Sequence, residues 1–324
     1  MKILTLLTFL ILQVPSYGQN LQKLSSCRSR TTGLFGLCNR EGKSIVEPQF
    51  CALGQTLNQN YFFVLKCNLE KDKYGNVYNV PQPNNEVWAM LDSLGNMVLG
   101  FENKYQNIFI NSGGFIEVKK MDLFGMVDFK NKILIPTIYE SMLFQNDSVI
   151  VKSNNLFGIV NNNNKTLVPI EYESIVITEY CIIAEKNKRE GVIDIKNKII
   201  IPFLYDKIFA FGKLFENEKK YSIVEINNKK AVIDFNNKYI VKPTTTNILE
   251  IVLNAFIAKK NDKYGLVNLN LKTLIPFEFN HYSIDYNKKF IEFRKTDYPF
   301  TYIYNYRGKL IKKQKDVQKE VESK

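Results

Sequence analysis

The stretch that decides the fold is Gly191-Val192-Ile193-Asp194-Ile195-Lys196-Asn197-Lys198-Ile199-Ile200-Ile201-Pro202. A small residue is followed by two apolar residues, an Asp, a turn that ends in Asn, a Lys and an aliphatic run before Pro. Closely similar stretches begin at Gly125, Gly158 and Gly265. A phrase that recurs at a nearly fixed period indicates a repeat architecture, in which each copy is one small structural unit.

Eight copies of the phrase align on their first residue, which we call the glycine slot. After a first interval of 53 residues, the copies follow one another at intervals of 33 to 40 residues. The sequence therefore predicts about eight tandem units, whose glycine slots are Gly36, Ala89, Gly125, Gly158, Gly191, Ala231, Gly265 and Tyr302.

Each copy has the pattern of a β-hairpin. The third residue after the glycine slot is Asp or Asn in every copy, and these side chains bond to the backbone just ahead of them in turns. The sixth residue is Gly or Asn except at Leu271, and Gly and Asn tolerate a positive φ. A Lys and an aliphatic strand follow, and we expect the Pro to end that strand because it has no N–H group.

An aromatic residue stands three residues beyond the usual Pro in five copies, and more strand-like sequence follows it. In one such segment we predict two strands, at residues 173–177 and 181–185. Each unit would then hold three or four antiparallel strands and would bury its apolar face by stacking on its neighbours. We expect an all-β, elongated, curved, solenoid-like stack, with a propeller-like closed ring as the alternative. The residues expected to pack between units are Phe50, Tyr139, Tyr172, Tyr205 and Phe279.

The repeated phrase resembles the WG repeat, also called the KWG repeat, of bacterial proteins. That pattern runs aromatic-Gly, apolar, Ile, Asp, a turn with Gly-Lys, aliphatics, Pro and Tyr-Asp, and the resemblance extends from about Phe35 to about Ile311. The name-giving Trp occurs once, as Trp88 before Ala89, and Tyr205-Asp206 is the full Tyr-Asp match. The resemblance implies β-rich repeats that bind or scaffold. It carries no catalytic residue, cofactor or metal ligand to this chain.

The N-terminus has the pattern of a secretory signal peptide over residues 1–18. Lys2 precedes an apolar run from Ile3 to Val14, and small residues up to Gly18 supply a cleavage site. We expect a repeat domain over residues 19–311, with an insertion at about 68–87, and a polar charged tail over residues 312–324. The localisation implied is the periplasm, cell surface or extracellular space. A lipoprotein anchored at Cys27 is a minor alternative, because Leu24-Ser25-Ser26-Cys27 matches a lipoprotein box that is set apart from the apolar run.

The chain is basic, with a formal net charge of +12 that falls by one when Lys2 is removed. Such a charge favours polyanionic neighbours. The simpler interpretation is that Lys solvates the hairpins and protects strand edges at the recurring turn position, which holds Lys43, Lys132, Lys165, Lys198, Lys238, Lys272 and Lys309.

Five cysteines are present, and four of them (Cys27, Cys38, Cys51 and Cys67) lie in the first mature segment. Export permits disulfides, and four cysteines allow three pairings, among which the sequence does not choose. A metal site is disfavoured because no close Cys-x2-Cys pair occurs. Cys181 alternates within an apolar strand and is expected in the core.

Candidate chemistry is sparse. His281 is the only histidine, and we expect it to be structural because no nucleophile or metal-binding motif accompanies it. The repeated carboxylates Asp92, Asp128, Asp194 and Asp234 suggest a glycosidase pair or calcium ligands. Turn formation explains them better, because half of the equivalent slots hold Asn.

The function expected from these observations is an exported, non-enzymatic repeat protein that binds or scaffolds protein or envelope components, without catalytic, cofactor-binding or metal residues. The alternatives are an enzyme acting on an envelope glycan and a binder of polyanions or carbohydrate. Function should be sought where the phrase fails: the insertion before Trp88, the sixth copy, in which Thr244-Thr245-Thr246 replaces the aromatic residue, and the loops between hairpins.

Overall fold

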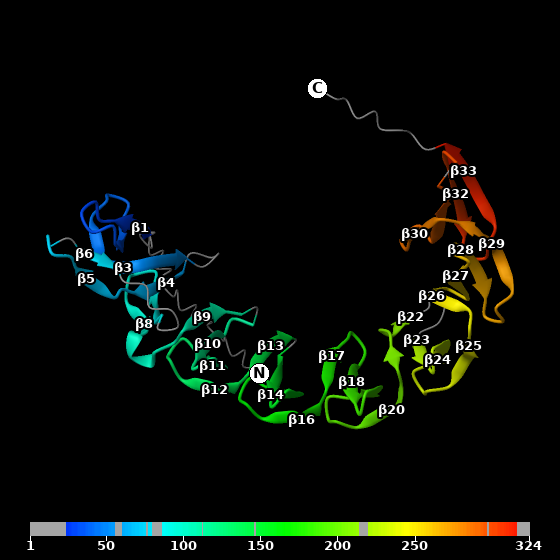
Figure 1. Cartoon of the computed structure of the whole chain (residues 1–324), viewed down its shortest axis with the longest axis horizontal. Coiled ribbons are helices and arrows are strands. Elements are labelled where there is room, and N and C mark those ends of the chain that lie inside the picture. The colour runs from blue at the N-terminus through cyan, green and yellow to red at the C-terminus, as the bar shows by residue number, and fades with distance from the viewer. Residues whose placement is uncertain are drawn as a thin grey trace, which may run out of the picture. The chain divides into compact units, whose positions relative to one another are not determined.

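The computed structural model describes residues 24–55, 60–75, 77–79, 86–111, 113–145, 147–213, 220–296 and 298–315 (Figure 1). The predicted signal peptide at residues 1–18 lies outside them. The described residues form antiparallel strands and one 3-10 turn, η1 (Phe101–Asn103), which confirms the all-β prediction. They contain no helix with the length and hydropathy of a membrane span. Two units, residues 1–137 and 138–324, are described separately.

The first unit contains two main sheets and a small hairpin. Sheet 1 has the order β1-β2-β3-β4-β7-β8, and sheet 2 has the order β12-β11-β10-β9. The hairpin β5–β6 lies within the predicted insertion. The strands are β1 (Ser25–Arg28), β2 (Phe35–Cys38), β3 (Ser44–Gln55), β4 (Tyr61–Lys66), β5 (Leu69–Lys71), β6 (Val77–Asn79), β7 (Trp88–Asp92), β8 (Met97–Leu99), β9 (Asn107–Ile110), β10 (Ile116–Lys120), β11 (Leu123–Val127) and β12 (Ile133–Tyr139), which crosses the boundary between the units.

The second unit contains five sheets that follow one another along the chain. Sheet 3 comprises β13 (Ser141–Gln145), β14 (Ser148–Ser153), β15 (Leu156–Asn161) and β16 (Thr166–Tyr172). Sheet 4 comprises β17 (Ser174–Ile177), β18 (Ile182–Lys186), β19 (Arg189–Ile193) and β20 (Ile199–Tyr205). Sheet 5 comprises β21 (Lys207–Ile208), β22 (Gly212–Lys213), β23 (Lys220–Ile226), β24 (Lys229–Asp234) and β25 (Tyr239–Thr244). Sheet 6 comprises β26 (Asn247–Val252), β27 (Ala255–Lys260), β28 (Lys263–Asn268) and β29 (Thr273–Phe279), and sheet 7 comprises β30 (His281–Asp285), β31 (Phe290–Arg294), β32 (Phe300–Asn305) and β33 (Leu310–Lys315).

The eight copies of the phrase form eight hairpins, but the described residues form only seven main sheets. In the later copies the chain turns directly after the aromatic residue, so that β16 ends at Tyr172 and β17 of the next sheet begins at Ser174. In the first copy the strand does not end at the aromatic residue. β3 is 12 residues long, continues past Phe50 and pairs with both β2 and β4. The first two copies therefore share one six-stranded sheet.

The apolar core lies between successive sheets of the second unit. One buried cluster joins Val192 and Ile201 of sheet 4 to Val224 and Ala231 of sheet 5. Equivalent clusters join sheet 3 to sheet 4, sheet 5 to sheet 6 and sheet 6 to sheet 7. Each sheet therefore buries its face against its neighbour, which confirms the tandem β-stack predicted from the repeats.

The turn positions behave as the sequence predicts. The Asp or Asn side chain accepts two backbone N–H groups in every copy; Asp194 Oδ1, for example, accepts from Lys196 at 2.8 Å and Lys198 at 2.9 Å. The other copies repeat this arrangement at Asn39, Asp92, Asp128, Asn161, Asp234, Asn268 and Asn305. The sixth position has a positive φ in every copy, including Leu271 at 61°.

The prediction that Pro ends the second strand is wrong. Pro169 lies inside β16, between the pairs Ile159↔Val168 and Phe157↔Tyr172, so that one residue of β15 opposes three of β16. Proline is tolerated here because β16 is an edge strand and the extra residues form a bulge without regular ladder bonds.

The same bulge explains the glycine slot. A Cβ atom on Gly158 would stand 2.8 Å from the Ile170 backbone, which crosses directly over the glycine. In the sixth copy only two residues of β25 oppose one of β24, and the slot holds Ala231. In the eighth copy the pairing around Tyr302 is regular, so a large side chain fits. The more extra residues the bulge contains, the smaller is the residue in the slot. Ala89 is an exception, because the strand opposite it is interrupted by a longer segment that contains η1.

The chain end differs from the predicted tail. Residues 312–315 belong to β33 and pair with β32, opposite Phe300 to Ile303. Backbone pairing with β32 places this charged segment in the sheet, although its side chains are mostly exposed. Residues 316–324 lie outside the described residues.

Candidate functional site

Successive copies in the second unit are linked by what we call tyrosine–asparagine bridges. The hydroxyl of Tyr172, the aromatic residue after Pro, donates to Oδ1 of Asn197, the positive-φ residue of the next turn, at 2.6 Å. Tyr205 makes the same bond to Asn237 at 2.6 Å, and Tyr139 makes it to Asn164 at 2.7 Å. The predicted packing role of these aromatic residues is confirmed, and each turn Asn serves as both a conformational residue and an acceptor.

The residue types at the two ends of the bridge change together. Phe50 and Phe279 have no hydroxyl, and the next positive-φ residues are Gly95 and Gly308, which have no acceptor. In the sixth copy the aromatic position holds Thr244, which pairs with Lys230 as Tyr172 pairs with Phe157, and Leu271 occupies the next turn. The succession from sheet 5 to sheet 6, which we call the 5/6 joint, therefore has neither an aromatic ring nor an amide at the bridge positions.

A second link follows each bridge tyrosine. Glu173 accepts the N–H groups of Asn187 and Lys188 at 2.9 and 3.1 Å, and both of these residues have positive φ in a two-residue hairpin turn. Asp206 accepts similarly from Asn227 at 2.6 Å. The Asp of the Tyr-Asp pair is thus a structural acceptor. The Asn residues of these two-residue turns, Asn187 and Asn227, are a sequence signal for hairpins that were not predicted.

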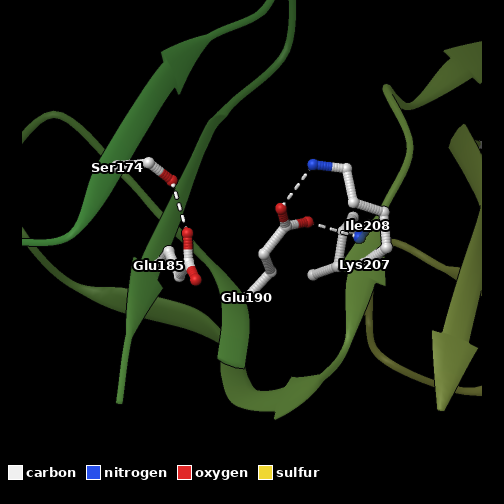
Figure 2. Close-up of polar contacts among 5 residues, drawn as sticks. All are labelled: Ser174, Glu185, Glu190, Lys207 and Ile208. Atoms are coloured by element: carbon white, nitrogen blue, oxygen red, sulfur yellow. Dashed lines mark hydrogen bonds and ion pairs between the residues drawn. The ribbon is translucent and has the colours of Figure 1, made fainter. Parts of the chain in front are cut away.

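Glu190, which stands in the Trp slot of the fifth copy, forms a buried polar link from sheet 4 to sheet 5 (Figure 2). Its carboxylate accepts from Lys207 Nζ at 2.7 Å and from the Ile208 backbone N–H at 2.5 Å. The bond to Glu190 raises the pKa of Lys207 above its ordinary value. Nearby, Ser174 donates to Glu185 at 3.1 Å (Figure 2). With its acceptor oxygens engaged by the protein, Glu190 acts as a structural anchor.

The 5/6 joint is irregular on both of its edge strands. The edge of sheet 5 is broken into β21 and β22, and the backbone of Phe209 in the gap is held by bonds to Ile223 and to the buried Ser222 hydroxyl. On sheet 6, β26 has a register shift between Ile248 and Glu250. The edge strands β13, β17 and β30 pair regularly, so the irregularity is specific to this joint among the later sheets. Bulges of this kind re-aim side chains and occur beside functional sites.

Both irregularities line one pocket of about 200 Å³. Phe209 and Tyr286 are 42 % and 47 % exposed, and they contribute aromatic surface. Leu249 and Ile251 add apolar surface from the bulged strand, while Glu250 adds a carboxylate. A small pocket with a few polar groups among apolar and aromatic ones has the composition of a ligand site.

Hydrogen bonds fix the carboxylate of the pocket. Tyr286 Oη lies 3.4 Å from Glu250 Oε1, and Tyr282 also bonds to Glu250. Burial, followed by the charge of Glu250, raises the pKa values of Tyr282 and Tyr286 above that of free tyrosine. Both phenols therefore stay protonated at neutral pH and act as donors to Glu250.

The Lys230 ammonium lies 4.5 Å from the centroid of the Phe209 ring. Lys230 also forms an ion pair with Glu225. The pocket is thus lined by an acceptor on sheet 6, and one of its aromatic rings contacts a cation on sheet 5.

The candidate residues from the sequence do not converge on this pocket. The repeated carboxylates Asp92, Asp128, Asp194 and Asp234 lie in separate turns, each engaged with backbone N–H groups. Among the described residues no group of three or more His, Cys, Asp or Glu side chains could hold a metal ion. His281 is exposed on the edge strand β30, opposite Arg294.

The cysteines resolve the pairing that the sequence left open. Disulfides join Cys27 to Cys38 and Cys51 to Cys67, which suits an oxidising compartment. The lipoprotein alternative is contradicted, because the Cys27 sulfur is bonded to Cys38 and not available for a lipid. Cys181 is buried directly before β18, as predicted for a core residue, and burial raises the pKa of its thiol.

A family model described as "WG containing repeat" matches residues 191–229. This segment begins at the glycine slot of the fifth copy and includes Tyr205-Asp206, so the match supports WG-type repeats in this chain. Among curated proteins, none has a sequence that matches it.

Solved structures give distant similarities. A crystal structure of the eukaryotic initiation factor has 11% identity and a TM-score of 0.41 over 90% of this chain and 87% of the other. The dihydro-heme d1 dehydrogenase NirN has 10% identity and a TM-score of 0.33 over 93% and 75%. PorZ, an essential bacterial surface component of the type-IX secretion system of Porphyromonas gingivalis, has 8% identity and a TM-score of 0.28 over 91% and 46%. At these TM-scores none of them carries a fold or a function to this chain.

Proposed function

We propose that this chain is an exported, non-enzymatic binding protein built from eight WG-type repeats, and that its ligand contacts the 5/6 joint. The observation that carries the proposal is the convergence of three departures on one place. The bridge residues are replaced by Thr244 and Leu271, both edge strands are irregular, and a pocket with aromatic and carboxylate surface lies there. Real proteins depart from their local rules mainly at functional or strained sites.

The arrangement supports binding rather than catalysis. Among the described residues that line the pocket, Glu250 is the one carboxylate, and its bonds to Tyr282 and Tyr286 hold it as an acceptor. A general acid–base pair or an activated nucleophile needs a second reactive group placed within reach. Aromatic residues near the centre of a contact surface, by contrast, supply binding energy without chemistry.

Export rests on the N-terminal sequence and is supported by the two disulfides. We expect residues 1–18 to be removed, so that the mature chain begins at Gln19 and resides in the periplasm, at the cell surface or outside the cell. N-terminal sequencing of the chain expressed with its own leader in a bacterial host tests this expectation. An intact Met1 on material confined to the cytosol would contradict it.

A paired-variant capture experiment tests the binding function. The immobilised chain is incubated with solubilised bacterial envelope, and retained components are compared with those of Leu249→Asp/Tyr286→Ala. The matched control Val176→Asp/Tyr298→Ala changes an exposed residue of the corresponding edge strand β17 and an exposed tyrosine elsewhere. We expect components retained by the unmodified chain and the control to be lost from the pocket variant. Equal retention by all three would contradict the assignment of the site.

A further inference from the structure

We infer that the pocket at the 5/6 joint binds a single neutral sugar ring of an oligosaccharide. This inference rests on the proposed binding function and adds the chemical class of the ligand. Four properties of the pocket carry it: its aromatic surface, its acceptor, the cation beside it and its size.

The aromatic surface suits the C–H face of a sugar. The face of an aromatic ring carries partial negative charge, which attracts weakly positive C–H hydrogens. Phe209 and Tyr286 come from different sheets and are both about half exposed, so a flat ring can contact them without unfolding of either edge. The main chain of Phe209 is fixed by Ile223 and Ser222, which reduces the ordering cost of binding.

The acceptor suits hydroxyl groups. An ionised carboxylate has about four lone-pair sites on its two oxygens. Tyr282 and Tyr286 donate to Glu250, and the remaining sites can accept from sugar hydroxyls. The same carboxylate repels phosphate, sulfate and uronic acid groups, so the polyanion alternative does not fit this pocket.

The neighbouring cation argues against a positively charged ligand. Aromatic faces bind ammonium groups when the ring is free to receive them. At Phe209 that role is taken by Lys230, 4.5 Å from the ring centroid. A ligand cation beside the same ring would be repelled by Lys230, whereas a neutral polyol meets no such repulsion and keeps Glu250 as its acceptor.

The size of the pocket sets the length of the contact. At about 200 Å³ it lies below the roughly 300–1,000 Å³ of pockets that enclose drug-sized ligands. It therefore receives one ring, and the rest of an oligosaccharide would continue into solvent. One ring with few contacts implies a dissociation constant on the order of millimolar.

Saturation-transfer difference NMR of the purified chain tests the inference. The sugar probes are cellotriose, maltotriose and chitotriose, and the comparison probes are tetramethylammonium and inorganic phosphate. We expect saturation transfer to at least one trisaccharide, strongest for the C–H protons of one ring. Tyr286→Ala should weaken this binding by about tenfold or more, and Glu250→Gln by about three- to tenfold through loss of a charge-assisted acceptor. Tyr298→Ala should leave the affinity unchanged, and near-ultraviolet circular dichroism confirms that each variant is folded.

The outcomes separate the inference from the function on which it rests. Tyr286-dependent binding of tetramethylammonium or phosphate, with no sugar bound, would overturn the sugar assignment and keep the pocket as a binding site. Trisaccharide binding that survives Tyr286→Ala would overturn the location. Absence of binding by every probe would overturn the sugar inference, while the envelope capture with Leu249→Asp/Tyr286→Ala separately decides the binding function.

Discussion

The joint from sheet 4 to sheet 5 and the 5/6 joint differ in how successive copies are held. At the former, Tyr205 bonds to Asn237, and Glu190 bonds to Lys207 and Ile208. At the latter, Thr244 and Leu271 replace the bridge residues, and a pocket lies between the irregular edge strands. Both joints bury an apolar cluster, so packing alone does not distinguish them. The succession from sheet 6 to sheet 7 also lacks a bridge, yet its edge strand β30 pairs regularly, so the comparison ties the pocket to a missing bridge combined with irregular edge strands.

The largest effect is expected at the glycine slot of a regular copy. Gly158→Ala places a Cβ 2.8 Å from the Ile170 backbone, which cannot move without breaking the bulge, and it should lower the free energy of unfolding by about 2–3 kcal/mol. Gly54→Ala is the control, because no atom lies within 4 Å of the added Cβ, and it should change stability by less than about 0.5 kcal/mol. Urea denaturation measures both. Equal effects of the two variants would show that the bulge does not restrict the slot.

Removal of one bridge should have a smaller effect. Tyr205→Phe deletes the hydroxyl that bonds to Asn237 and should cost about 1 kcal/mol of stability. Asn237→Gly keeps the positive φ and removes the acceptor, which reproduces the Phe279–Gly308 pair found later in the chain. In a double-mutant cycle we expect a coupling energy of about 0.5–1.5 kcal/mol. Additive effects would mean that the bridge contributes nothing of its own.

Installation of a bridge at the 5/6 joint should convert it toward the regular type. Leu271→Asn suits the φ of 61° but removes a side chain that packs against the sheet 5/6 cluster, so alone it should be nearly neutral. Combined with Thr244→Tyr, it should stabilise by about 0.5–1 kcal/mol more than the sum of the single changes. Thermal unfolding of the four forms measures this term. A double variant no more stable than the sum would show that the joint cannot accept the bridge geometry.

The smallest effect concerns the turn carboxylates. Backbone N–H groups, first that of Lys132, hold the pKa of Asp128 below its ordinary value. A lowered folded-state pKa contributes stability above the unfolded-state pKa, and this stability is lost as the pH falls through the folded-state pKa. Asp128→Asn should therefore reduce the loss of stability below about pH 4 and leave the protein nearly unchanged at pH 7. Asn161→Asp, in the equivalent slot, should add acid sensitivity. Identical acid titrations of stability for both variants and the parent chain would contradict this account.

The sequence predicted the local hairpins well because each of their requirements is a single residue type. Asp or Asn accepts the turn N–H groups, and the sixth residue adopts positive φ, both of which depend on residues close together in the chain. The bulge around Pro169 was missed because it depends on which strand lies at the sheet edge, a property of pairing over the whole meander.

From the sequence, only the approximate location of the pocket could be predicted, as a place where the repeated phrase departs from its usual residues. Thr244 and Leu271 are visible departures in the sequence, and they lie at the joint that carries the site. Glu250 and Phe209 carry no sequence signal of their own, since their placement depends on a register shift in β26 and a gap between β21 and β22. The polar partners of the regular joints were likewise invisible, because Tyr172 and Asn197 stand 25 residues apart.

Hydrogen exchange of the edge strands tests the central claim most directly. The amides of β17 (Ser174–Ile177), next to a bridged joint, and β26 (Asn247–Val252), at the 5/6 joint, are compared by mass spectrometry in the unmodified chain and in Thr244→Tyr/Leu271→Asn. We predict that β26 exchanges about tenfold faster than β17 in the unmodified chain, and that the installed bridge slows β26 without affecting β17. Equal exchange of the two strands, or a β26 rate indifferent to the double substitution, would contradict the claim that the missing bridge opens this joint.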